Sequence, residues 1–104
     1  MGIDVNLIGE QREPEQQVVD SKNILAALAS KNWIERSVTV CLRSNDPWGD
    51  TIFNQAQLPV LLAELNQIEQ EQPDSAIKAH LRDVIRLVEL ANGRVHTYIE
   101  FSGD

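Results

Sequence analysis

The side chains best suited to chemistry are concentrated between residues 43 and 54. Arg43, Asp46, Trp48 and Asp50 all fall in this stretch. Two carboxylates this close in sequence can bind a cation or work as an acid–base pair. A tryptophan on a turn can anchor a protein–protein interface, because it buries a large area when a partner covers it. These four residues are therefore the candidate partner-binding group.

The same residues also have a structural explanation. An aspartate followed by Pro47 and, two residues later, Gly49 matches a type I turn, in which the Asp46 side chain bonds backbone N–H groups two residues on. Trp48 can equally fold back onto the protein's own sheet. Both explanations stay open from the sequence.

The rest of the sequence contains few residues that could bind a metal ion or act as a catalytic nucleophile. His80 and His96 are the only histidines, and Cys41 is the only cysteine. No HExxH, CxxC, Walker or GxSxG motif is present. Cys41 is expected to be a small buried hydrophobe, and His80 to be a partly buried, hydrogen-bonded side chain beside an apolar helix stripe. We predict no catalytic residue, no metal site and no bound cofactor.

The charge balance narrows the choice of partner. Sixteen Asp and Glu residues oppose nine Lys and Arg residues, which gives a net charge of −7. Nucleic acid and anionic membranes both attract clustered positive charge, so neither is an expected partner. An acidic domain can steer onto a basic protein partner, but solubility alone is the simpler explanation of a net charge of this size. Lys78, Arg82 and Arg86 recur every fourth residue, which is more typical of a solvated helix face than of an anion site.

The length and composition of the chain limit the classes of protein to which it can belong. The chain has 104 residues, which predicts a single domain over residues 1–104. No apolar run approaches the roughly 18 residues that a membrane-spanning helix needs, and the first residues do not have the pattern of a secretory signal. A single cysteine cannot form an internal disulfide, which suits a reducing compartment. We expect a cytoplasmic protein.

Alternating apolar and polar residues predict several strands. The clearest lie at 3–8, at 37–43 and at 94–101. The Asp-Pro-Trp-Gly turn predicts a hairpin that returns through 50–54. Residues 9–17 are polar and predict a turn or exposed hairpin tip, after which Val18 and Val19 close a short second strand.

Three helices are expected from a 3.6-residue apolar period and from capping residues. Asp20 or Ser21 can cap a short helix that ends near Lys31. Pro59 suits the first turn of the next helix, and Pro73 separates it from a third helix that ends at Asn92–Gly93. The second and third helices should pack as an antiparallel pair.

These elements, in the order β(β)αββααβ, predict a two-layer α+β fold. The sheet is expected to be mixed or antiparallel, with helices packed on one face. The residues expected in the core are aliphatic and lie on the apolar faces of the second and third helices and of the 37–43 strand. They are Leu61, Leu65, Ile77, Leu81, Val84, Ile85, Val88, Val38, Val40 and Leu42.

A resemblance accompanies these motifs. The segment DPWGDTIFN (46–54), the helix start LPVLL (58–62) and the ending YIEFSGD (98–104) resemble a group of small bacterial proteins. The resemblance covers roughly the C-terminal two-thirds of the chain. It implies a bacterial source and brings no activity, so no functional residue is carried over from it.

The leading hypothesis is a small acidic interaction protein without enzymatic activity. Its sharpest form is an immunity or inhibitor protein that masks a basic toxin or enzyme. Its simpler form is a subunit that associates with itself. The alternative class is a small ligand-binding domain or enzyme that uses the hairpin region 43–54.

Overall fold

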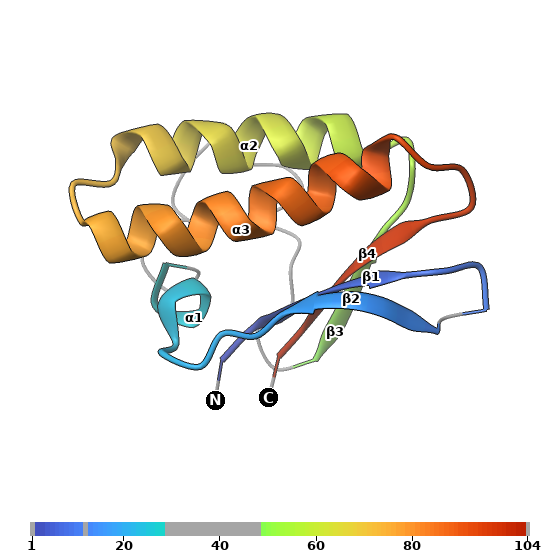
Figure 1. Cartoon of the computed structure of the whole chain (residues 1–104), viewed down its shortest axis with the longest axis horizontal. Helices are drawn as coiled ribbons and strands as arrows, with labels where there is room; N and C mark the ends of the chain where they lie inside the picture. The colour runs from blue at the N-terminus through green and yellow to red at the C-terminus, as the bar shows by residue number, and fades with distance from the viewer. Residues whose placement is uncertain (1, 12, 29–48, 104) are drawn as a thin grey trace.

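A four-stranded antiparallel sheet with two long helices on one face forms the described part of the protein, and this confirms the predicted α+β class (Figure 1). The structure is a computed structural model that describes residues 2–11, 13–28 and 49–103. The strands are β1 (Asp4–Ile8), β2 (Pro14–Val18), β3 (Asp50–Phe53) and β4 (Tyr98–Ser102). The helices are α1 (Ile24–Leu28), α2 (Leu58–Glu71) and α3 (Ser75–Asn92).

The sheet joins segments from opposite ends of the chain. Its strand order is β2-β1-β4-β3, so β1 and β4 form the central pair. Each neighbouring pair is antiparallel, which decides between the mixed and antiparallel sheets that the sequence allowed. β3 is the return strand expected after the turn. The predicted strand over 37–43, and therefore its hairpin, lies outside the described residues.

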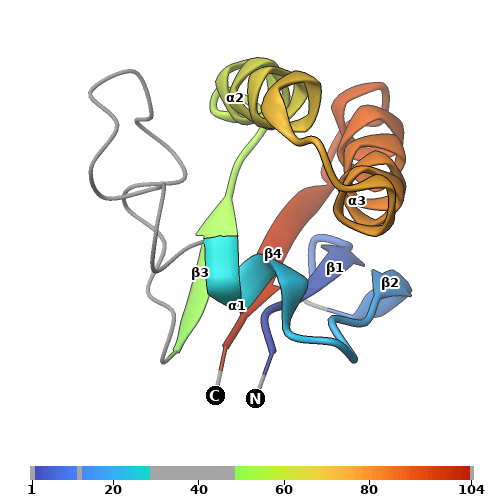
Figure 2. The ribbon, with the colours of Figure 1, turned by 90° about the vertical axis from the view of Figure 1, so that its left-hand side faces the viewer.

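Alternation along the central strands separates the two faces of the sheet. Val5 and Leu7 of β1, and Ile99 and Phe101 of β4, are fully buried in the apolar core beneath the helices. The residues between them point to the opposite face. No described helix covers that face (Figure 2). We call it the uncovered face.

α2 and α3 form an antiparallel pair, as predicted. Pro59 lies in the first turn of α2, where its missing N–H costs nothing. Asp74 caps α3, because its Oδ1 accepts hydrogen bonds from the N–H groups of Ala76 (2.8 Å) and Ile77 (3.2 Å). Gly93 follows the last residue of α3. α3 packs directly on β1, β2 and β4, and α2 packs against α3.

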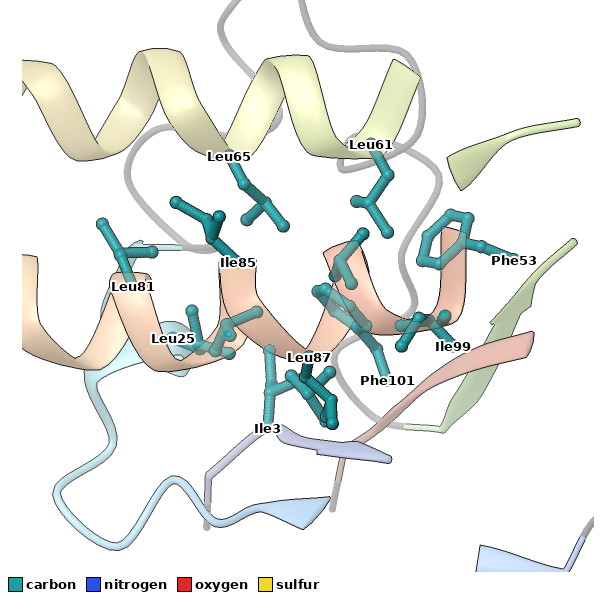
Figure 3. Packing of buried hydrophobic residues seen from close by; sticks show 14 of the residues in the cluster. Ile3, Leu25, Phe53, Leu61, Leu65, Leu81, Ile85, Leu87, Ile99 and Phe101 are labelled. Carbon is teal, nitrogen blue, oxygen red and sulfur yellow. The ribbon is translucent and has the colours of Figure 1, made fainter. Parts of the chain in front are cut away.

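The core is a continuous apolar cluster between the helices and the sheet (Figure 3). The rings of Phe53 and Phe101 meet edge to face, with their centroids 5.4 Å apart. Ile77 is only half-buried. The other helix residues expected in the core are buried: Leu61, Leu65, Leu81, Val84, Ile85 and Val88. Val38, Val40 and Leu42 lie outside the described residues.

The second strand begins earlier than the sequence indicated. Residues 14–17 were expected in the hairpin tip, yet β2 starts at Pro14 and runs to Val18. Its polar, exposed residues hide the usual strand pattern, because β2 is an edge strand with little to bury. Pro14 is tolerated at the start of such a strand, since its missing N–H need not join a ladder.

The last strand begins later than the sequence indicated. Residues 94–97 were expected in that strand, but they form a turn before β4. His96 adopts a left-handed backbone conformation with φ of 56°, which breaks the alternation. Val95 is therefore 80% exposed instead of facing the core.

Gln55 explains why this turn is stable. Its Nε2 group donates to the main-chain oxygens of Ala91, Arg94 and Thr97, at distances of 3.0, 2.7 and 2.7 Å. These contacts bind carbonyl groups at the end of α3 and in the turn that follows it, where the Ala91 oxygen also accepts from the Arg94 N–H at 3.1 Å. One side chain thus connects the start of α2 to the end of α3.

Candidate protein-interaction surface

The structure places one of the four predicted partner-binding residues. Asp50 begins β3 and is exposed, and its Oδ1 accepts a hydrogen bond from Ser102 Oγ at 2.8 Å. Arg43, Asp46 and Trp48 lie outside the described residues, so their grouping with Asp50 stays a prediction. Asp50 itself belongs to the margin of the uncovered face.

A polar ladder crosses this face between β2, β1 and β4. Gln17 Nε2 donates to Asn6 Oδ1 at 2.8 Å, and Asn6 Nδ2 donates to Glu100 Oε1 at 2.9 Å. Asn6 lies directly opposite both neighbours in the strand register. Asn6 is only 7% exposed, so the ladder orders the middle of the face.

Three carboxylates on the uncovered face share one arrangement. Asp4, Asp50 and Glu100 occupy its alternate strand positions. In each, one oxygen accepts a hydrogen bond from the protein: from the Asp20 N–H at 2.8 Å for Asp4, from Ser102 for Asp50 and from Asn6 for Glu100. Their second oxygens have no partner among the described residues. The three side chains are therefore held in place and can still accept hydrogen bonds.

Positive charge is placed elsewhere in the described structure. The four described strands contain no lysine or arginine. Lys78 and Arg82 of α3 reach Glu69 of α2, with N–O distances of 3.8 and 2.8 Å. Arg86 pairs with Asp83 on its own helix at 3.1 Å. The basic stripe of α3 thus forms ion pairs in the helix layer, away from the uncovered face.

A buried carboxylate fixes the start of α1. Asp20 Oδ2 accepts from the N–H groups of Ile3 (3.0 Å) and Ala26 (3.2 Å), and Oδ1 accepts from the N–H of Ile24 at 2.6 Å. The sequence predicted Asp20 or Ser21 as the acceptor for N–H groups of the first turn, and Asp20 supplies it from four residues before the helix. Because it also binds Ile3, Asp20 fastens α1 to the beginning of β1.

His80 lies beside this carboxylate. Its Nε2 is 3.8 Å from Asp20 Oδ1 and has no hydrogen-bond partner within the described residues. Its side chain is 13% exposed, so the expected partial burial is confirmed, whereas Nε2 makes no hydrogen bond to the residues that the structure describes. The Asp20 oxygens are already bound by main-chain N–H groups. We therefore assign this pair a structural role.

A groove of about 670 Å³ runs between β2 and α3. Its lining includes Val18 and Leu87 together with the ion pair of Asp83 and Arg86. Two further apolar side chains at the groove are open to solvent, Val19 at 54% and Leu90 at 39%. Apolar surface beside an exposed strand edge is a common feature of peptide-binding sites.

The structure offers no obvious metal centre in the parts that it describes. Within residues 2–11, 13–28 and 49–103, no three His, Cys, Asp or Glu side chains converge on a point that could hold an ion. Cys41 lies outside these ranges. No described helix combines the length and apolar composition needed to cross a membrane.

Comparison with known proteins adds no constraint on function. No protein-family model, no curated protein and no solved structure matches this chain. The resemblance of residues 46–54, 58–62 and 98–104 to small bacterial proteins therefore stays a prediction. The candidate surface rests on the geometry alone.

Sequence reasoning did not single out the residues that build the uncovered face. Asn6 and Glu100 were visible only as the polar members of two alternating strands. The missing information was that β1 and β4 are neighbours, which brings residues 94 positions apart into hydrogen-bond contact. Asp4 was missed because its hydrogen-bond donor, the Asp20 N–H, comes just after β2, and the sequence did not show that β2 begins at Pro14 and pairs with β1.

Proposed function

We propose that this protein is an interaction module without enzymatic activity, which binds a basic surface of another protein on the uncovered face of its sheet. The supporting observation is the set of three carboxylates, Asp4, Asp50 and Glu100, each held by one oxygen, on a sheet whose described strands carry no positive side chain. Carboxylates that are already ordered lose little conformational freedom on binding. Their common sign attracts a basic partner and speeds its association.

Charge also selects the kind of partner. A second copy binding through the same face would bring two sets of like charges together, which opposes self-association there. A basic enzyme or toxin fits the face instead. In this form the protein acts as an inhibitor or immunity protein that masks its partner.

The alternative, a small ligand-binding domain or enzyme, uses Arg43, Asp46 and Asp50. Asp50 is the one described member, and it is exposed and bound to Ser102. An exposed carboxylate held by one hydrogen bond is what the proposed binding face requires. No described feature favours the alternative over the interaction module.

The test compares two triple variants that remove the same amount of negative charge. D4N/D50N/E100Q neutralises the uncovered face while keeping each anchored oxygen as an acceptor. D83N/E71Q/E89Q neutralises three acids of the helix layer. The probe is a blocked oligolysine peptide, titrated into the ¹⁵N-labelled protein at low and high salt.

We expect the peptide to shift amide resonances of β1, β3 and β4 in the wild-type protein. The face variant should bind about tenfold more weakly at low salt, since three solvent-screened charge contacts of about 0.5 kcal/mol each, together about 1.5 kcal/mol, are lost. The helix variant should bind almost normally. Equal weakening in both variants would mean that only net charge matters, and the proposal would be wrong.

A further inference from the structure

The edge strand β2 combines three features that bear on how a partner docks. Among the described residues, β2 is paired with β1 alone, so its outer edge has no strand beside it. The groove between β2 and α3 lies along that edge. Strands added to a sheet edge gain main-chain hydrogen bonds, and pockets beside the edge receive alternate side chains.

We infer that the β2 edge binds an extended segment of a basic partner in which apolar and basic residues alternate. An added strand points successive side chains to opposite faces of the sheet. Its apolar residues would enter the groove, on Val19, Leu87 and Leu90. Its basic residues would extend toward the uncovered face, where Asp4 belongs to the neighbouring strand β1. The partner's basic character rests on the proposed function.

Charge at the β1–β2 hairpin supports a basic occupant. Glu10, Glu13 and Glu15 lie in this hairpin or in β2, and Glu15 is paired with Arg94 at 2.9 Å. In the sequence of residues 9–18 these three carboxylates stand against one arginine, Arg12, which lies outside the described residues. An approaching lysine-rich strand is therefore attracted to this end of β2.

The same features disfavour a second copy as the occupant. Pro14 removes a main-chain donor, Glu15 adds charge, and the register of β2 shifts beside Ile8. Prolines, charges and bulges are the means by which natural edge strands avoid pairing with themselves. The carboxylates of the hairpin repel a second copy of this acidic chain and attract a basic strand. This difference lets the edge discriminate between the two occupants.

The test uses a short blocked peptide in which lysine and valine alternate, with oligolysine as the comparison probe. Amide hydrogen exchange of residues 14–18 and chemical shifts along β2 and α3 are measured with each peptide. Val19→Ser/Leu90→Ser removes the exposed apolar side chains of the groove. Val60→Ser is the matched control, because Val60 is a similarly exposed valine (44%) on α2.

We expect the alternating peptide to slow exchange in β2 and to bind about tenfold more weakly to the groove variant, as for interface residues that anchor a contact. Val60→Ser should leave its affinity unchanged, and the groove variant should leave oligolysine binding unchanged. If the alternating peptide shifts only the uncovered face, or if the groove variant binds it normally, the edge-strand inference is wrong while the proposed function stands.

The opposite failure is also recognisable. If the alternating peptide protects β2 but D4N/D50N/E100Q binds oligolysine as the wild type does, the edge site stands and the proposed face is wrong. Protection of β2 in the peptide-free protein, together with dimers in sedimentation analysis, would show that a second copy occupies the edge and would overturn the inference.

Discussion

The two faces of the sheet are built from the same strands and serve different purposes. On the covered face, Val5, Leu7, Ile99 and Phe101 have no exposed surface. On the uncovered face, Asn6 and Glu100, each one position away from these residues, carry an amide and a carboxylate that are ordered by the ladder through Asn6. The one-residue step from Val5 to Asp4, or from Phe101 to Glu100, therefore separates a fully buried core side chain from a carboxylate that is only half-buried.

This difference shows how a small domain can specialise. The hydrophobic contribution to stability comes from one side, so charged residues on the other side can change with little effect on folding. The comparison is testable, because it assigns a large stability effect to one face and a large binding effect to the other.

The largest expected effect is on the covered side. Leu81→Ala removes a fully buried side chain of α3 and should lower the free energy of unfolding by about 2–5 kcal/mol. Ile52→Ala, at a half-buried position of β3 on the uncovered face, should cost about 1 kcal/mol or less, because less surface is lost from contact. Chemical denaturation measures both. Similar losses for the two variants would break the comparison between the faces.

A buried carboxylate should behave unlike the carboxylates of the uncovered face. Asp20→Ala leaves the N–H groups of Ile3, Ile24 and Ala26 without their acceptor, and should cost about 2–3 kcal/mol. Asp20→Asn keeps one acceptor oxygen and should cost less. Thermal melts of both variants check this order, and amide exchange at Ile24 should rise most in the alanine variant. An unchanged melting temperature for Asp20→Ala would contradict a structural role.

The polar ladder should contribute modestly to stability. Asn6→Ala removes two side-chain hydrogen bonds and should cost about 1 kcal/mol, since Gln17 and Glu100 can turn to water instead. Its effect on oligolysine binding should exceed that of a groove variant, because Glu100 loses the contact that orders it. Urea denaturation and peptide titration on the same sample separate the two effects. If Asn6→Ala lowered the free energy of unfolding by more than about 3 kcal/mol, Asn6 would contribute as much to stability as a core residue does, which contradicts this prediction.

The smallest effect on stability is expected at Asp50. Asp50→Asn keeps the acceptor for Ser102 Oγ on an exposed side chain, so the free energy of unfolding should change by about 0.5 kcal/mol or less. Binding of a basic peptide should nevertheless weaken at low salt. That effect should shrink as salt rises, because the Debye length falls from about 10 Å at 0.1 M to about 3 Å at 1 M. A salt-independent effect would point to a lost contact rather than to charge.

The helical half of the fold could be predicted from the sequence. The apolar spacing of Leu61 and Leu65 in α2 and of Leu81 and Val84 in α3 is a local signal, as is the proline at position 59, and the structure confirms each of them. Helix formation depends on neighbours three and four residues away, which a single sequence displays directly. The alternating strands at the two ends of the chain were visible for the same reason.

The sheet edges and the candidate site were harder to predict. β2 has polar, exposed residues at 15–17, because an edge strand that buries only Val18, and that in part, shows little alternation. Val95 continued an alternating pattern, yet the left-handed His96 and the amide of Gln55 hold that segment as a turn. Such contacts join residues about 40 positions apart and leave no local mark. Of the predicted site, Asp50 alone can be placed.

The central pairing of β1 with β4 has a consequence for the order in which the protein can fold during synthesis. β1 and β2 leave the ribosome early, but a two-stranded hairpin is at best marginally stable in water. The other neighbour of β1 is translated about 90 residues later, after both long helices. A nascent chain that stops before Tyr98 therefore holds helices with no complete sheet to pack on. We expect such arrested chains to be readily degraded by proteases, and protection to appear only once residues 98–102 have cleared the exit tunnel.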